Sequence, residues 1–161
     1  MTEQSGFVPP QLPVDVDAPT GAGPPRWDIA CAVAAGGAVG GALRYLMGIA
    51  ISTGPAGFPW ATFVENVSGC LILGALLVFL VDVWRPLRYI RPFLATGVLG
   101  GYTTFSTYTE DIRSLVEAGQ GPLALTYMFG SIALGVVAAV VGMNVARKAA
   151  GLPLWGREAP Q

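Results

Sequence analysis

The sequence predicts an all-α membrane protein with four transmembrane helices, the third of them broken in the middle. Of the 161 residues, 53% are hydrophobic and only 12% are charged. Those proportions are unusual for a water-soluble domain of this length. A helix needs about 20 residues to cross the hydrocarbon core of a membrane. Four such segments with short connections would occupy nearly all of the chain after residue 27, which leaves no room for a separate soluble domain.

Long apolar runs separated by turn-forming residues place the four helices. Gly- and Pro-rich connections end the runs, and Trp60, Trp84 and Arg85 stand where interfacial anchors are expected. The expected spans are residues 29–51, 62–81, 92–116 and 123–146.

The middle of the third span, residues 100–107, reads GGYTTFST and is too rich in Gly, Thr and Ser for an ordinary lipid-facing helix. We interpret it as a break in the helix. Main chain that leaves helical geometry at membrane depth survives only where it is buried in protein or lines a polar cavity. The carbonyl oxygens from Gly100 to Thr103 would then suit a hard cation such as sodium; a glycine hinge without an ion is the alternative.

The ends of the chain differ from its centre in composition. Residues 1–26 contain six prolines and no long apolar run, which predicts a disordered tail, and they lack the basic start of a signal peptide. Residues 27–147 form the expected membrane domain, and residues 148–161 a short cytoplasmic tail.

Several function classes do not fit this composition. The nine basic residues are scattered and the net charge is −1, so no electrostatic footprint for nucleic acid is present. Histidine is absent, and no nucleophile, base and orienting group can be assembled from the spans, which argues against an enzyme. Cys31 and Cys70 lie in apolar segments and are interpreted as small buried hydrophobic residues.

Glycines recur at a spacing of four residues in the first and third spans. Such small residues let helix backbones approach closely in a membrane. Because four thin helices with so much small-residue surface hardly enclose a pathway alone, we expect at least a dimer. The glycine pairs are Gly36 with Gly40, Gly37 with Gly41, and Gly97 with Gly101.

Polar side chains inside a membrane are costly and mark functional hypotheses. Thr62 and Asn66 lie on one face of the second helix, and the neutral amide of Asn66 could draw a small anion out of water without trapping it. Hydrogen bonding that only joins two helices is the alternative. Arg44 and Glu65 are also embedded, and for Glu65 we favour a side chain that extends to the headgroups.

Aromatic and hydroxyl groups continue this polar pattern. The ring edges of Phe105 and Tyr108 carry the positive end of the ring quadrupole and can stabilise an anion; plain core packing is the alternative. Several hydroxyls could form a track for a dehydrating ion, or bond back to their own helices. These hydroxyls belong to Thr104, Ser106, Thr107, Tyr127 and Ser131.

Three motifs carry a resemblance to a known family. GGAVGGALRY in the first span, Asn66-x-x-Gly69 in the second and GGYTTFSTY at residues 100–108 resemble the fluoride channels of the Fluc (CrcB) family over residues 28–147. The resemblance implies a dimer of oppositely oriented subunits in the cell membrane, two fluoride pores and a structural sodium ion at the dimer interface. Its function would be passive export of fluoride, which relieves fluoride toxicity.

The same resemblance implies roles for individual residues. Asn66 would donate to fluoride, Phe105 would present a ring edge, and Thr62 and Arg44 would line the pore approach and the vestibule. Two positions depart from the family pattern: Tyr108 replaces a second Phe, and Asp111 replaces a Glu. The remaining implied residues are Ser106, Thr107, Tyr127 and Ser131 along the pore, and Gly100 and Thr103 with their carbonyls on sodium.

Basic residues are distributed unevenly between the two sides of the membrane. With four spans, seven lie on the side of both termini, and only Arg113 lies clearly opposite. This bias predicts one fixed orientation with cytoplasmic termini. Together with Tyr108, it leads to the hypothesis of a heterodimer with a homologous subunit of opposite orientation. The seven are Arg26, Arg85, Arg88, Arg91, Arg147, Lys148 and Arg157.

Two other membrane functions remain as alternatives. A small multidrug-type proton-coupled exporter needs an acidic residue in the middle of its first span, and residues 29–51 contain none. A membrane subunit that transports nothing fits the composition, but it leaves the polar break unexplained.

Overall fold

A computed structural model of the chain describes residues 26–51, 57–84 and 88–154, and all regular secondary structure in these ranges is helical. Elements labelled η are π-helical, with turns wider than those of an α-helix. The helices are α1 (Trp27–Ala50), α2 (Trp60–Val78), η1 (Phe79–Val83), η2 (Pro92–Leu99), α3 (Gly100–Tyr102), α4 (Phe105–Glu117) and α5 (Gly121–Ala149).

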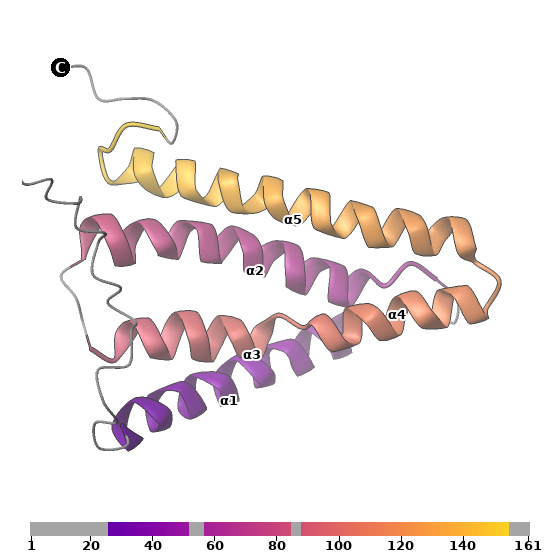
Figure 1. Ribbon diagram of the computed structural model, residues 1–161, viewed down its shortest axis with the longest axis horizontal. Helices are drawn as coiled ribbons and strands as arrows, with labels where there is room; N and C mark the ends of the chain where they lie inside the picture. Colours follow the sequence, from indigo (N-terminus) through magenta and orange to yellow (C-terminus); the bar gives the residue numbers. More distant parts are fainter. Residues whose placement is uncertain (1–25, 52–56, 85–87, 155–161) are drawn as a thin grey trace, which may run out of the picture.

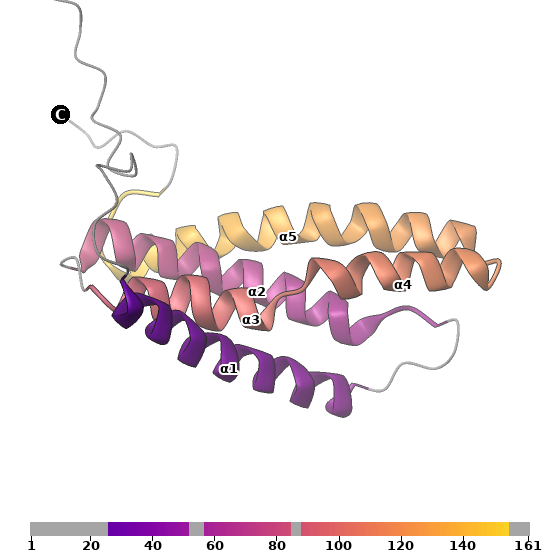
Figure 2. The ribbon, with the colours of Figure 1, turned by 60° about the horizontal axis from the view of Figure 1, so that its bottom comes forward.

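Three of these helices are long and apolar enough to cross a membrane, namely α1, α2 continued by η1, and α5. The segment formed by η2, α3 and α4 runs alongside them (Figures 1 and 2). The chain is therefore a multi-pass membrane protein. The helical segments agree with the predicted spans to within a few residues, whereas the expected tail at residues 1–26 lies almost entirely outside the described ranges.

The predicted break in the third segment is present, but it is shorter than residues 100–107. Gly100–Tyr102 are still helical, and helix α4 begins at Phe105. Only Thr103 (ψ 155°) and Thr104 (φ −147°, ψ 126°) have extended backbone. These two extended residues offset α4 from α3, and Figure 2 shows the thin, non-helical connection between the two helices.

Glycine contacts bring α1 against the first half of the broken segment, as predicted. A Cβ atom at Gly36 would collide with the carbonyl oxygen of Phe93, and one at Gly40 with that of Val98. The same device joins α2 to α5, where Gly142 lies against the backbone of Leu71. Backbones this close gain van der Waals contact that larger residues would prevent.

Most large apolar side chains face outward. Exposed residues include Leu46 and Ile49 on α1 and Val137 and Val141 on α5. So continuous an apolar surface is unfavourable in water but is compatible with the hydrocarbon core of a membrane. The compact core lies where α4 meets α5 and consists of buried Tyr108, Leu115, Ala124 and Tyr127.

Two ion pairs lie near the end of the bundle where α1 begins and α5 finishes. Arg88 pairs with Asp28, and Arg147 pairs with Asp82 at 2.9 Å. Arg113 lies on α4, toward the opposite end of the bundle (Figure 1). The described part of the chain thus keeps the predicted separation of basic residues, although Arg85 and Arg157 lie outside it.

Replacing Gly36 with Ala is expected to lower the free energy of unfolding by about 1–3 kcal/mol, because the new methyl group overpacks the α1–η2 contact. Gly37→Ala is the matched control, since a Cβ there meets nothing within 4 Å. The control should keep or slightly raise stability, as Ala is favoured over Gly in a helix. Denaturant titration in detergent micelles measures both, and equal effects of the two variants would contradict the contact.

A groove at the helix break

The backbone of the break is held by one side chain from the neighbouring helix. The Asn66 side-chain oxygen accepts from the Thr104 N–H at 2.9 Å, and its amide nitrogen donates to the Thr104 carbonyl at 3.1 Å. Thr104 is only 7% exposed, so both backbone groups would otherwise be buried without partners. The alternative of Asn66 as a link between helices is therefore observed. One N–H of its amide is left for a further acceptor.

Sequence also determines how α4 starts again. Thr104 is the N-cap of α4, and its hydroxyl accepts from the Thr107 N–H at 3.2 Å. Gly69 makes room for the break from the side of α2, since a Cβ there would collide with the Thr103 side chain. The break is thus supported on both sides by short polar or small residues.

These bonds divert donors from two carbonyl oxygens. In an uninterrupted helix, the N–H groups of Thr104 and Thr107 would donate to the carbonyls of Gly100 and Thr103. Here they donate to Asn66 and to the Thr104 hydroxyl instead. The carbonyls of Gly100 and Thr103 therefore lose their usual helical donors, and both residues line one groove.

This groove has a volume of about 400 Å³ and runs between α2, the break and α5. Its lining carries no charged side chain within the described ranges. Six of the predicted site residues meet in it: Asn66, Gly100, Thr103, Phe105, Tyr108 and Ser131. The other lining residues are Gly69, Cys70, Leu73, Leu99, Thr104 and Ile132.

The two aromatic residues at the groove differ in environment. Phe105 is 77% exposed, with its ring centre 5.9 Å from that of Tyr108. Tyr108 is buried, and its hydroxyl donates to the Met128 carbonyl of α5 at 2.8 Å. The hydroxyl that departs from the family pattern is therefore engaged with the protein.

Ser131 and Tyr127 are buried on the same face of α5 but have different surroundings. The Ser131 hydroxyl has no hydrogen-bond partner among the residues the structure describes. The Tyr127 hydroxyl donates to Asp111 at 3.2 Å and lies outside the groove. A buried hydroxyl without a partner is costly, and Ser131 belongs to the lining of the groove.

Other predicted site residues lie away from the groove lining. Thr62 is buried and Arg44 is half-buried. Ser106 and Thr107 are exposed, and their hydroxyls bond with that of Thr104 at 3.2 and 3.1 Å. The hydroxyls at the break thus bond with one another, whereas the Tyr127 hydroxyl bonds with Asp111.

Three sequence interpretations need correction. Glu65 is only 3% exposed and does not extend to the headgroups. Cys31 is exposed, and Cys70 is half-buried at the groove, so neither is a fully buried hydrophobic residue in this chain. Helical periodicity alone could not predict these exposures, because it does not distinguish a helix face that meets lipid from one that lines a groove.

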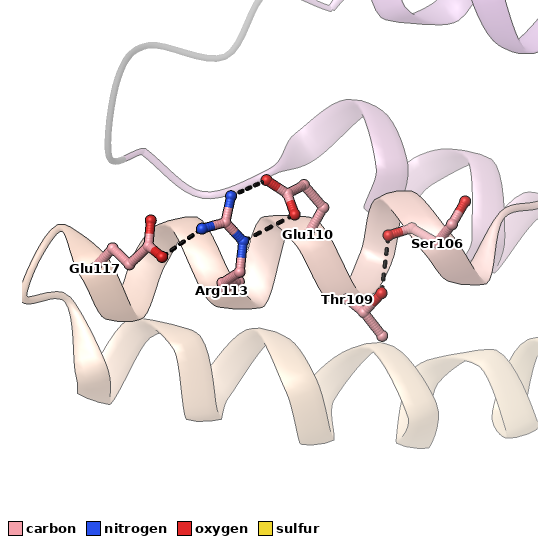
Figure 3. A network of polar contacts seen from close by, with 5 residues as sticks. All are labelled: Ser106, Thr109, Glu110, Arg113 and Glu117. Carbon is pink, nitrogen blue, oxygen red and sulfur yellow. Dashed lines mark hydrogen bonds and ion pairs between the residues drawn. The ribbon is translucent and has the colours of Figure 1, made fainter.

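The exposed face of α4 carries a polar network instead of apolar residues. Arg113 pairs with Glu110 and Glu117, and Thr109 donates to the Ser106 carbonyl (Figure 3). Glu110 and Arg113 are each more than half exposed. This face needs water or a polar partner beside it.

The site offers a metal ion neutral oxygen atoms and not a cluster of the usual His, Cys, Asp or Glu ligands, among the described residues. Within residues 26–51, 57–84 and 88–154, no three His, Cys, Asp or Glu side chains stand close enough to hold a metal ion. The carbonyls of Gly100 and Thr103 fit a hard cation by donor chemistry, because oxygen ligands suit such ions.

Asn66→Ala is expected to lower the free energy of unfolding by on the order of 2–4 kcal/mol, because two buried backbone groups of Thr104 lose their partners. Thr126→Ala is the control, since that exposed hydroxyl bonds only to its own helix. Denaturant titration in detergent micelles measures the free energy of unfolding of these variants. If Asn66→Ala lost no more of it than Thr126→Ala, the role of Asn66 in holding Thr104 would be contradicted.

Comparison with known proteins places these features in a family context. A family model described as CrcB-like protein, Camphor Resistance (CrcB), matches residues 31–143. Fluoride-specific ion channel FluC 2 of Nocardia farcinica is 44% identical over 76% of this chain and 88% of its own length. Fluoride-specific ion channel FluC of Nitrobacter winogradskyi is 42% identical over 76% and 98%. Fluoride-specific ion channel FluC 2 of Streptomyces avermitilis is 47% identical over 65% and 66%.

Proposed function

Since this chain belongs to the family of CrcB-like proteins, we propose that it is a fluoride-selective channel that lets fluoride leave the cell passively across the cell membrane. Passage of an ion breaks no covalent bond, so the chain is not an enzyme. Relatives named as fluoride channels favour this function over a multidrug exporter or a subunit without transport.

The observation that carries the proposal is the uncharged groove with donors free to bind an anion. Asn66 keeps one N–H beyond its bond to Thr104, and the Ser131 hydroxyl has no partner in the described part of the chain. Phe105 presents a largely exposed ring beside them. Neutral donors and a ring edge can replace water around a small anion without holding it as a fixed cation would.

The remaining predicted residues take supporting roles in this proposal. Thr62 lines the approach, and Arg44 attracts anions to the vestibule. Ser106, Thr107 and Tyr127 supply hydroxyls along the way. The bond of Tyr108 to Met128 supports a role for its ring rather than for its hydroxyl.

A second four-span subunit, inserted in the opposite orientation, would complete the channel as a dimer. An open groove and an exposed Phe105 ring support this arrangement, because a channel must close its pathway against lipid. The carbonyls of Gly100 and Thr103 would hold a structural sodium ion at the dimer interface. The positive charge of the sodium ion would attract carbonyl oxygens from the helix breaks of both subunits and so hold the two breaks together.

The partner is proposed to be a homologous subunit rather than a second copy. Basic residues concentrate at the end of the helix bundle that holds both termini of the membrane domain, which favours one orientation in the membrane. Streptomyces avermitilis has relatives numbered FluC 2 and FluC 3, so several such chains exist in one organism. Tyr108 would then make the two pore halves unequal.

In liposomes that contain this chain together with its homologous partner subunit, Phe105→Ala is expected to reduce fluoride efflux roughly tenfold or more, since losing about 1.4 kcal/mol of stabilisation at the barrier changes a rate tenfold. Phe129→Ala is the matched control, because Phe129 is an exposed aromatic residue on α5 outside the groove. Fluoride and chloride electrodes measure both ions. Equal fluoride flux in both variants would remove Phe105 from the pathway, and equal wild-type flux of the two ions would contradict fluoride selectivity.

Expression of this chain alone tests the heterodimer. The chain by itself should give little fluoride efflux, and co-expression with a homologous subunit of opposite charge bias should restore it, because only then are both orientations supplied. Purification by a tag on this chain measures whether the second subunit is retained. Full efflux from the chain purified alone would show that it pairs with itself.

A further inference from the structure

Two unpaired arginines lie at one end of the helix bundle, where α1 and η2 both begin (Figure 1). Arg26 directly precedes α1, Arg91 directly precedes η2, and both are exposed. The side chain of neither arginine makes a hydrogen bond or an ion pair with any residue of the described ranges. On α4, toward the opposite end, Arg113 is already paired with Glu110 and Glu117. The end where α1 and η2 begin therefore has positive charge left for a ligand.

Side-chain contacts tie the start of α1 to the residues that precede η2. The Asp28 carboxylate pairs with Arg88 and accepts a hydrogen bond from the Tyr89 hydroxyl at 3.1 Å. Arg26 lies two residues before Asp28. Arg91 lies two residues after Tyr89. Since the glycine contacts described above hold α1 and η2 together farther along, the two unpaired arginines belong to adjoining helix starts.

Aromatic side chains indicate that this end lies at the level of the lipid headgroups. Trp27 is 72% exposed and Tyr89 is 47% exposed. Such residues are enriched where a membrane meets water, because their rings are apolar and each ring carries one polar group. The next exposed residues along α1 are Ala30, Cys31 and Ala34, which are small and apolar. A charged headgroup and an apolar chain would therefore each meet a matching surface here.

The charges at this end favour a negatively charged ligand. Among the described residues around the starts of α1 and η2, Arg26, Arg88 and Arg91 are basic and Asp28 is acidic. Asp28 balances the charge of Arg88, so the charges of the other two arginines remain without a counter-charge. A guanidinium group can donate two parallel hydrogen bonds to phosphate oxygens, which makes phosphate a suitable ligand for these arginines.

We propose that Arg26 and Arg91 bind the phosphate group of an anionic phospholipid whose acyl chains lie along the exposed apolar surface of α1. Basic residues next to membrane-spanning helices attract acidic lipids. A free phosphate ion would use the same arginines, but the exposed Trp27 ring and the apolar surface below it favour a lipid. Neither arginine lines the groove, so the inference does not depend on the proposed fluoride function.

Lipid binding to the full chain tests the proposal. Phosphatidylglycerol is titrated into the purified chain in detergent micelles, and native mass spectrometry measures the dissociation constant of the bound lipid. Arg26→Gln and Arg91→Gln should each raise this constant about fivefold, and the double variant about 30-fold, as expected for basic residues that contact an anionic lipid. Phosphatidylcholine, whose headgroup has no net charge, should bind the wild type more weakly than phosphatidylglycerol.

Lys148→Gln is the matched control. Lys148 is also exposed and without an ion pair in the described part of the chain, but it lies on α5, which packs chiefly against α2. Its replacement removes the same charge from another part of the fold and should leave the dissociation constant unchanged. Without added lipid, the arginine variants should unfold at the wild-type temperature, because neither side chain has a partner among the described residues to lose. Weaker lipid binding then cannot result from a loss of folded protein.

Three results would overturn the proposal. Equal weakening by Lys148→Gln and Arg26→Gln would show that the lipid responds to the total charge of the chain and not to this site. Equal binding of phosphatidylcholine and phosphatidylglycerol would show that the headgroup charge is not recognised. Displacement of the lipid by an equal concentration of inorganic phosphate would show that the two arginines hold a free anion rather than a lipid.

Discussion

A chain that leaves helical geometry inside a membrane must find new partners for its peptide groups, and here one amide side chain supplies them. Asn66 pairs with both the N–H and the carbonyl of Thr104, which lets two residues adopt extended backbone at a depth where water is scarce. The start of α4 follows from the Thr104 hydroxyl cap, and this cap together with the Asn66 bond takes the usual helical donors from the carbonyls of Thr103 and Gly100. The rest of the site is arranged around it.

Close helix packing makes this arrangement possible. Gly36 and Gly40 bring α1 against the backbone of η2 and α3, while Gly142 brings α5 against α2. Beside the break, between α2 and α5, lies the groove. One amide N–H of Asn66 supports the backbone of the break, and the second N–H is the one that the proposed anion binding would use.

The groove contains polar groups, but its lining carries no charged side chain among the described residues. Its lining presents amide, hydroxyl and ring edges, which favour an anion modestly. The exposed charges of Glu110, Arg113 and Glu117 satisfy one another on the outer face of α4 and belong to a different surface.

The sequence by itself determined the spans, the break, the glycine contacts and the candidate residues Asn66, Phe105 and Ser131, because each depends on local composition or helical spacing. Only the tertiary structure decided that Asn66 holds Thr104, that Tyr108 bonds to Met128 and that Glu65 is buried rather than extended to the headgroups. Those outcomes depend on which helix faces which. Helical periodicity gives the face a residue occupies, but not the partner that meets it, so contacts between distant segments had to come from the fold.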